Sequence, residues 1–226
     1  PQILAPAERR RAPDTVALAL EVAAASVAAS GRDARDLPCV FISSQGDLAI
    51  NDYMCSTLAA DPLLLSPIKF HNSVHNAAVG YWTIGTGCQA SSTSLTAFDQ
   101  SFAVGLLEAA TQCAADLRPM LVVAYDIAAV GALGSITRSE GLLAGALVLA
   151  PQRSARSVCA LDWSIEPGDG SAPALRSDAA RALAGNAMAD ALPLFESLAL
   201  ARDESLRLPL SPSLALHLRL APLPPT

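Results

Sequence analysis

The chain has 226 residues, 21 acidic and 15 basic, which gives a formal net charge of −6 and a pI near 5.0. Hydrophobic residues make up 52% of it and charged residues 16%, a composition that excludes a disordered chain and predicts a sizeable core. The small number of Lys and Arg residues argues against nucleic acid or an anionic membrane as a partner.

The apolar residues are too dispersed for a membrane span, although the mean hydropathy of +0.37 is high. No apolar run reaches the roughly 18–20 residues that a span needs, so we expect a permanent protein interface to cover the excess apolar surface. The five cysteines form no C-x-x-C pair and share no ligand spacing with the three histidines. We therefore expect reduced thiols in a cytoplasmic protein, with no metal and no cofactor.

The first 13 residues are expected to form an extended arm, because they contain three prolines and a run of arginines at 9–11. A basic triplet near a terminus is typically solvated, and the alternative is docking to an acidic partner. A first β-strand is expected before Asp14, but the arm does not have the pattern of one. Either the tail strand at 214–220 fills that gap in the sheet, or the strand has been lost.

From residue 14 onward the chain alternates between helical and extended patterns. Apolar residues spaced three to four apart predict helices, and short apolar runs with β-branched residues predict strands. The predicted elements are, in chain order, a helix at 14–30, a strand at 39–43, helices at 50–58 and 73–84, a strand at 92–97, a helix at 99–115, strands at 120–125, 145–150 and 157–165, a helix at 178–192, and strands at 206–210 and 214–220. The alternation predicts an α/β fold with a mostly parallel sheet that becomes mixed toward its end.

The last predicted strand places its leucines on one face and His217 and Arg219 on the other. This pattern is typical of a half-buried strand, which we expect at a sheet edge. We expect His217 to be solvated there rather than to bind a ligand.

The most informative block is a strand, a sharp turn and a helix at residues 92–115, followed by another apolar strand. A residue at such a turn has the amino end of the helix behind it. Free N–H groups there favour negative charge, lower the pKa of a thiol and can form an oxyanion hole.

The sequence resembles a known family in this block and around it. The matching stretches are Asn72-Ser-Val-His-Asn-Ala-Ala-Val-Gly-Tyr-Trp82, Gly105-Leu-Leu-Glu-Ala-Ala110, Met120 to Asp126, and Glu140 to Leu149. Over about residues 12–165 the chain resembles the N-terminal half of β-ketoacyl synthases, and most of all the short chain length factors found beside aryl polyene (pigment) synthases. The resemblance implies a thiolase-like α/β fold, a mixed sheet flanked by helices. It places the ketosynthase-like domain at 14–165, with a C-terminal helix and tail strands at 166–226 packed on the same domain.

The resemblance also locates the position of the family's nucleophile. One frame, which keeps the helix and both strands in step, places it at Asp99, and a shifted frame places it at Ser91. Neither residue is a cysteine, and a carboxylate at a helix N-terminus is stabilised as an anion. We expect Asp99 to act there through charge and packing rather than through chemistry.

Three other residues are candidates for a nucleophile or a metal ligand. Cys88 is either a displaced nucleophile or a small buried residue, and the second role is expected. His71 and His75, four residues apart, have no third ligand nearby and are expected to pack or cap rather than bind metal. The histidine pair that the C-terminal half of a ketosynthase supplies has no counterpart here.

We therefore predict a non-catalytic chain length factor that forms a heterodimer with an active β-ketoacyl synthase and helps to set acyl chain length in fatty-acid or polyketide-type (aryl polyene) biosynthesis. An acyl carrier protein would be reached through that partner. The predicted dimer-interface strand consists of Ser92, Thr93, Ser94, Leu95, Thr96 and Ala97, an edge that no Lys or Pro protects. The alternatives are an acyltransferase or thioesterase that uses Ser91 or Cys88 with His71 or His75, and a structural homodimer without an acyl substrate.

Overall fold

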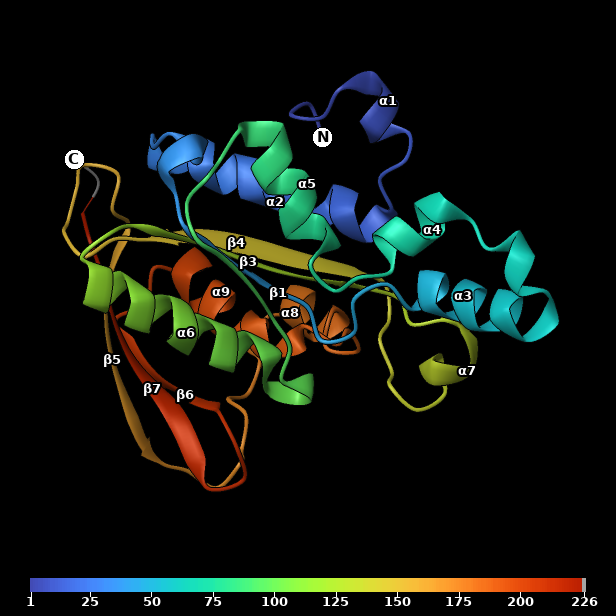
Figure 1. Cartoon of the computed structure of the whole chain (residues 1–226). Coiled ribbons are helices and arrows are strands. Elements are labelled where there is room, and N and C mark those ends of the chain that lie inside the picture. The colour runs from blue at the N-terminus through green and yellow to red at the C-terminus, as the bar shows by residue number, and fades with distance from the viewer. Residues whose placement is uncertain (225–226) are drawn as a thin grey trace.

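Two β-sheets and two helical layers make up the computed structural model, which describes residues 1–224 (Figure 1). The first sheet has the strand order β2-β1-β3-β4. Its strands are β1 (Cys39–Ile42), β2 (Ser92–Leu95), β3 (Met120–Ile127) and β4 (Leu142–Leu149). β1 runs parallel to β2 and β3, and β4 is antiparallel to β3, so the sheet is mixed as predicted.

The second sheet is antiparallel throughout and has the order β5-β7-β6. Its strands are β5 (Cys159–Pro167), β6 (Glu204–Pro209) and β7 (Leu214–Pro222). The division expected at residue 165 falls inside β5, which pairs along its whole length with β7. This sheet therefore joins the ketosynthase-like segment to the C-terminal segment.

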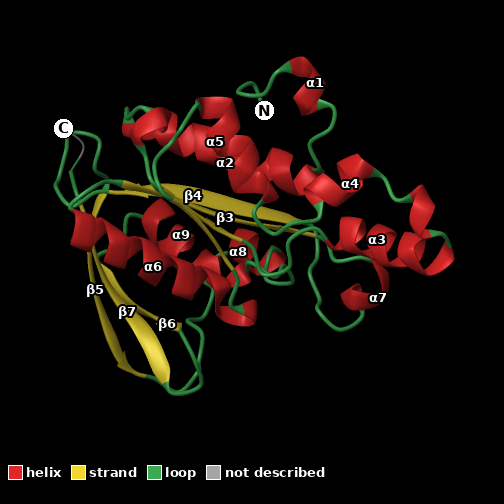
Figure 2. Cartoon of the chain, in the orientation of Figure 1, coloured by secondary structure: helices red, strands yellow, loops and turns green. Residues whose placement is uncertain are grey.

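Helices cover both faces of the first sheet (Figure 2). α2 (Asp14–Ser30) and α5 (Ala77–Thr86) lie on one face, and α6 (Ser101–Asp116) and α9 (Leu192–Ala199) lie between the two sheets. The remaining helices are α1 (Pro6–Arg9), α3 (Leu48–Ala60), α4 (Pro67–Asn72), α7 (Gly131–Gly134) and α8 (Asp178–Ala182). None of the helices within residues 1–224 is long and apolar enough to cross a membrane.

The alternation of side chains along β1 and β3 creates two cores. Val40 and Ile42 enter the core between the sheets, whereas Cys39 and Phe41 enter the core beneath α2 and α5. Successive side chains of a strand point to opposite faces, so a strand covered on both sides must be apolar throughout. This requirement explains the continuous apolar runs from which both strands were predicted.

Three expectations about elements were wrong. The arm contains one turn of helix, α1, where we expected extended chain. The helix expected at 178–192 forms only over its first five residues, as α8. Turns and a 3₁₀ turn at Ala189–Ala191 follow, and α9, with Pro193 in its first turn, begins only at Leu192. The strand at 214–220 is the central strand of its sheet rather than an edge, since a sheet with one solvated face gives the same pattern in either place.

The gap expected in the first sheet does not exist. β1 is hydrogen-bonded to β2 on one side and to β3 on the other, so no further strand fits between them. The tail strand β7 belongs to the second sheet and does not complete the first.

Candidate functional site

The candidate site lies at the carboxyl ends of the parallel strands β1, β2 and β3. Ligands of α/β proteins are typically bound at this end of a parallel sheet, where strands lead into loops and helix N-termini. The chain leaves β2 at Leu95 and makes a short 3₁₀ turn at Phe98–Gln100 before α6 begins. The Thr96 hydroxyl donates to the Ser44 carbonyl at 3.0 Å, which ties this turn to the end of β1.

Phe98 has an unusual conformation in the turn. Its φ is +51°, in the left-handed region that bulky residues rarely occupy, and its side chain is 74% exposed. The Phe98 carbonyl accepts hydrogen bonds from the hydroxyls of Ser44 at 3.0 Å and Ser101 at 2.7 Å. The Ser101 hydroxyl also accepts from the Ala97 N–H at 2.9 Å. These three bonds hold the turn in one conformation.

The amino end of α6 is occupied by a carboxylate from a distant part of the chain. Asp190 Oδ2 accepts from the N–H of Phe102 at 2.8 Å and from that of Ala103 at 3.3 Å. Burial raises the pKa of Asp190 to about 7, against the lowering effect of these two bonds, and the nearby charge of Asp126 adds to the rise. The other oxygen, Oδ1, is buried and has no hydrogen-bond partner in the described part of the chain. The N–H groups that could hold an anion at this helix start are therefore already bound.

Ser43, His75 and Asp126 lie together beside the turn but do not form the hydrogen bonds of a catalytic triad. The Ser43 hydroxyl donates to Asp126 Oδ1 at 2.7 Å and accepts from the Gly46 N–H at 2.8 Å. His75 Nε2 is 2.9 Å from the Ser43 carbonyl oxygen rather than from its hydroxyl. The Ser43 side chain is also fully buried, so it cannot reach a substrate.

Asp126 links the ends of two strands. It accepts from the Ser44 N–H at 2.8 Å as well as from Ser43, and burial raises its pKa despite these bonds. Asn186 Nδ2 donates to the Asp126 carbonyl at 3.3 Å and to the Glu140 carbonyl at 2.9 Å. The buried polar groups at this end thus hold loops together, which is a structural role.

Of the residues predicted for the nucleophile position, only Asp99 lies at the turn. Its side chain is exposed, and among residues 1–224 it makes no hydrogen bond or ion pair; the helix start is instead bonded by Asp190. Asp99 therefore does not accept from these N–H groups, and the expectation that it acts through charge and packing stays a prediction. The residue with the left-handed backbone is Phe98, one position before Asp99.

Ser91 and Cys88 lie at the opposite, amino end of the first sheet. The Ser91 carbonyl accepts from the Cys39 N–H at 3.1 Å, and the Cys88 thiol donates to the Leu37 carbonyl at 3.5 Å. His75 lies beyond the other end of β1, about four residues or ~13 Å away along the strand. The structure therefore does not bring Ser91 or Cys88 together with His75.

The remaining candidate ligands also have packing roles or lie apart. The His71 ring meets the Tyr81 ring edge-on, with the centroids 6.1 Å apart. All five thiols are free; Cys39, Cys88 and Cys113 are buried, whereas Cys55 is exposed. No group of three or more His, Cys, Asp or Glu side chains that could hold a metal ion occurs within the described residues.

The edge strand β2 has one open side. The carbonyls of Ser91 and Leu95 accept from β1, so by alternation the backbone groups of Ser92 and Ser94 point away from the sheet. No other strand of the described chain pairs there. Thr96 and Ala97, which we predicted as part of the strand, lie just beyond its end.

Exposed apolar side chains gather in the segment that precedes His75. Leu63 is 93% exposed, although leucine is usually buried in folded proteins. The other exposed large apolar residues of this segment are Leu58, Leu64, Ile68, Phe70 and Val74. We call these six residues the apolar lobe. Exposed apolar side chains gathered in this way typically mark a protein interface.

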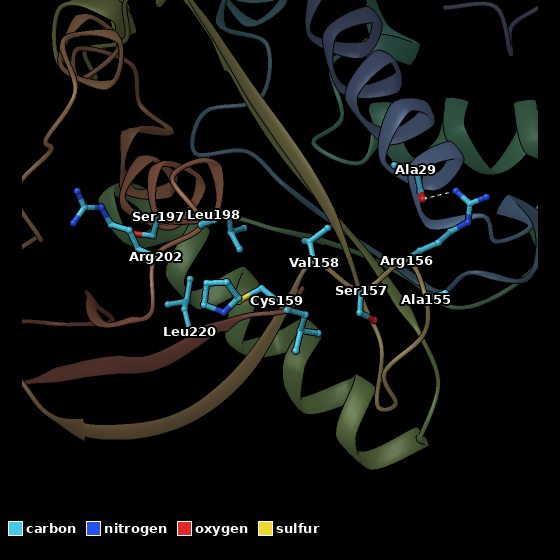
Figure 3. Close-up of a pocket in the computed structure, with 13 residues that line it drawn as sticks. Ala29, Ala155, Arg156, Ser157, Val158, Cys159, Ser197, Leu198, Arg202 and Leu220 are labelled. Carbon is cyan, nitrogen blue, oxygen red and sulfur yellow. Dashed lines mark hydrogen bonds between the residues drawn. The ribbon is translucent and has the colours of Figure 1, made fainter. Parts of the chain in front are cut away.

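A hollow of about 450 Å³ lies far from the turn, at the carboxyl end of α2 (Figure 3). Its walls include Val158, Cys159 and Leu220. The Arg156 guanidinium is turned away from these residues and donates to the Ala29 carbonyl at 3.2 Å. Without polar groups that converge on it, the hollow lacks the features of an active site.

The sequence matches a known protein family, and the structure resembles solved structures with the same fold. The sequence model of the family described as "Beta-ketoacyl synthase, N-terminal domain" matches residues 2–205. A chain of the solved ketosynthase in complex with its chain length factor from Xenorhabdus doucetiae is 20% identical, with a TM-score of 0.71 over 96% of this chain and 81% of that one. The ishigamide ketosynthase/chain length factor has a TM-score of 0.72 at 14% identity, over 99% of this chain and 84% of that one.

A more distant structure shares the same architecture. An HMG-CoA synthase complexed with CoA has a TM-score of 0.53 at 14% identity, over 94% of this chain and 71% of that one. No curated protein sequence matches the chain. At these identities the structural likenesses establish the fold.

Proposed function

From the premise that the chain belongs to the family of β-ketoacyl synthase N-terminal domains and has the predicted thiolase-like fold, we propose that it is a non-catalytic chain length factor. It pairs with an active β-ketoacyl synthase in fatty-acid or polyketide-type (aryl polyene) biosynthesis and helps to set the acyl chain length. An acyl carrier protein reaches the complex through the partner. The position equivalent to the nucleophile lies at the turn, at Asp99 beside Phe98.

The observation that carries this proposal is that the amino end of α6 is already hydrogen-bonded to Asp190. In this family fold the turn before α6 is where an acyl group would be attached and its oxyanion stabilised. Here the turn carries Phe98 and Asp99, neither of which is a nucleophile for a thioester, and Asp190 binds the N–H groups of Phe102 and Ala103.

The open edge of β2 and the apolar lobe support the pairing. An unprotected edge strand is a template for pairing with another chain, and a partner strand would satisfy the outward backbone groups of Ser92 and Ser94. The lobe adds apolar area of the kind that a permanent interface covers. The two solved structures with TM-scores above 0.7 are a ketosynthase in complex with its chain length factor and the ishigamide ketosynthase/chain length factor.

The pairing can be tested on one backbone group. Ser94→Pro removes an N–H that points away from β1, so the fold of the single chain should survive, whereas a strand pair across the interface loses a hydrogen bond and meets the proline ring. Ser94→Ala keeps the N–H and is the matched control. Each variant is co-expressed with the neighbouring β-ketoacyl synthase and purified through a tag on the partner.

We expect wild type and Ser94→Ala to co-purify with the ketosynthase at equal stoichiometry and Ser94→Pro to be lost. If the wild-type chain forms only a dimer with itself, it is the structural homodimer of the alternative hypothesis. Co-purification of Ser94→Pro at the wild-type level would show that β2 is not the interface.

A further inference from the structure

Phe98 is a large aromatic side chain that the single chain leaves unpaired. It is 74% exposed at the turn between β2 and α6. Its nearest aromatic neighbour along the chain, Phe102, is fully buried and packs on Phe195 with ring centroids 5.8 Å apart. Within the described residues Phe98 itself makes no ring contact.

The exposure of Phe98 is not the result of a loose turn. Its carbonyl is held by the hydroxyls of Ser44 and Ser101, and the preceding N–H of Ala97 is held by Ser101, whose side chain is fully buried. The backbone therefore fixes the direction of the Cα–Cβ bond of Phe98. A group fixed before binding loses little conformational entropy when it is bound.

Leu117, at the other end of the same helix, is a natural comparison. It has the same φ of +51° and the same exposed fraction of 74%. Leu117 ends α6, and a left-handed residue is the usual way for a helix to end. No such local reason exists for Phe98, where the strained conformation is maintained by side-chain hydrogen bonds. Strain maintained in this way is typical of functional positions.

The surroundings of Phe98 indicate which molecule its side chain contacts. The turn follows three residues after Leu95, so the ring lies at the end of the open β2 edge. Across the end of that strand, Thr96 is bonded to Ser44, and the adjacent Ser43 carbonyl is bonded to His75, which directly follows the apolar lobe. The apolar lobe therefore ends, at Val74, next to a residue that is bonded at the carboxyl ends of the strands where Phe98 lies.

We propose that Phe98 is an anchor residue that inserts into an apolar pocket of the partner ketosynthase, beside the strand pair formed by β2. The inference rests on the proposed function and adds the residue that carries the binding energy. An exposed aromatic ring that becomes buried in the complex is the usual form of such an anchor. The hydrogen-bonded turn fixes the place on the surface from which the ring projects.

The test compares Phe98→Ala, Phe98→Tyr and Leu117→Ala. Binding of each purified variant to the purified ketosynthase that co-purifies with wild type is measured by titration calorimetry, after thermal unfolding has shown that all variants are folded. We expect Phe98→Ala to raise the Kd at least tenfold. Leu117→Ala removes an equally exposed apolar side chain with the same φ and should change the Kd less than twofold. Phe98→Tyr keeps the ring and should remain within about threefold of wild type.

The outcomes separate this inference from the proposed function. Equal Kd values for wild type and Phe98→Ala would overturn the anchor while the complex itself stands. Absence of any complex with wild type would overturn both. A wild-type homodimer that Phe98→Ala dissociates would show that the anchor is received by a second copy of this chain, which would overturn the assignment of the partner.

Discussion

Asp190 illustrates how one carboxylate can determine the electrostatics of a helix start. Its Oδ2 receives two backbone N–H groups of α6, while its Oδ1 is buried without a hydrogen bond in the part of the chain that the structure describes. A carboxylate in such a place is stabilised by the helix and destabilised by the loss of water. The loss of water dominates, because the pKa of Asp190 is raised from its usual value of 3.8 to about 7.

The raised pKa of Asp190 predicts a pH dependence of stability. Between about pH 4 and pH 7 the unfolded chain releases this proton while the folded chain retains it, so the free energy of unfolding falls as the pH rises through this window. Asp190→Asn removes the titration and keeps an oxygen for the two N–H groups. From pH 5 to pH 8 we expect the melting temperature of Asp190→Asn to rise relative to wild type by at least about 2–4 °C, the shift that 1 kcal/mol produces in a domain of this size.

The control for this pH profile is Asp99→Asn, which neutralises an exposed carboxylate at the same helix end. The difference between its melting temperature and that of wild type should stay constant from pH 5 to pH 8. A constant difference for Asp190→Asn as well would show that Asp190 is ionised normally in the folded protein.

Truncation of the two aspartates should change the free energy of unfolding by different amounts. Asp190→Ala leaves the N–H groups of Phe102 and Ala103 without their acceptor and should cost about 0.5–2 kcal/mol, as the loss of a helix cap does. Asp99→Ala removes an exposed side chain without a partner in residues 1–224 and should change stability by less than about 0.5 kcal/mol. Denaturant unfolding at pH 7 measures both, and the reverse order would return the capping role to Asp99.

Sequence reasoning could find the turn but not the residue that bonds to it. The strand and helix that flank the turn are local patterns, and Asp99 is the carboxylate adjacent to the helix start in the sequence. The carboxylate that bonds to the helix start, Asp190, is 88 positions from Phe102 along the chain, in a segment whose local pattern shows no sign of the contact. Such a pairing depends on the tertiary fold, which the pattern of one sequence does not encode directly.

At the scale of elements, the interior strands were the easiest to foresee. β1 and β3 are covered on both faces, so their sequences are continuous apolar runs with few other interpretations. The early end of α8 at Ala182 was harder to foresee, because the helical spacing of apolar residues continues into the turn that follows it. The order of strands in the second sheet was not accessible, since β7 pairs with both β5 and β6 through backbone groups that all residues share.

The second sheet predicts a contrast between its two faces. Leu216 is fully buried between the sheets, and Leu216→Ala should cost about 2–5 kcal/mol through lost burial and the cavity that it leaves. Arg207 lies on the outer face with its side chain 67% exposed and pairs with Glu166 at 3.0 Å. Arg207→Ala should cost less than about 1 kcal/mol, since exposed ion pairs contribute little. A large effect of Arg207→Ala in denaturant unfolding would indicate that another structure covers this face.

The apolar lobe predicts a separation between stability and assembly. Leu63→Ser and Phe70→Ser replace exposed side chains, so the melting temperature of the isolated chain should stay within about 2 °C of wild type. Both substitutions remove apolar area from the proposed interface and should weaken co-purification with the ketosynthase. Lys69→Ser, between the two on an exposed surface, is the control and should leave co-purification unchanged. Loss of binding with Lys69→Ser alone would favour a charged contact over an apolar one.

At the scale of the whole molecule, the two sheets divide the surface into different kinds of face. Helices cover both sides of the first sheet, and α6 and α9 cover the inner side of the second (Figure 1). The outer side of the second sheet carries polar groups that pair with one another, including His217 with Glu166 at 3.2 Å. Exposed large apolar side chains remain at the apolar lobe and at Phe98, and others, among them Ile84, Ile136 and Val158, lie elsewhere on the surface. The high apolar fraction of the sequence is therefore not explained by one region of the surface.

The proposed lack of catalysis at the turn leads to a prediction that involves the whole fold. Phe98→Cys, in a Cys55→Ser background that removes the exposed natural thiol, places a cysteine at the turn. This thiol should react with iodoacetamide, because the position is exposed, yet it should form no adduct with an acyl-thioester probe. A thioester requires an activated thiolate and stabilisation of the oxyanion. Here Asp190 occupies the α6 N–H groups, and His75 is engaged by the Ser43 carbonyl on another loop. Intact-mass spectrometry after incubation with each reagent distinguishes the two reactions. An acyl adduct at position 98 would show that the fold retains catalytic electrostatics and that the loss of activity is confined to one side chain.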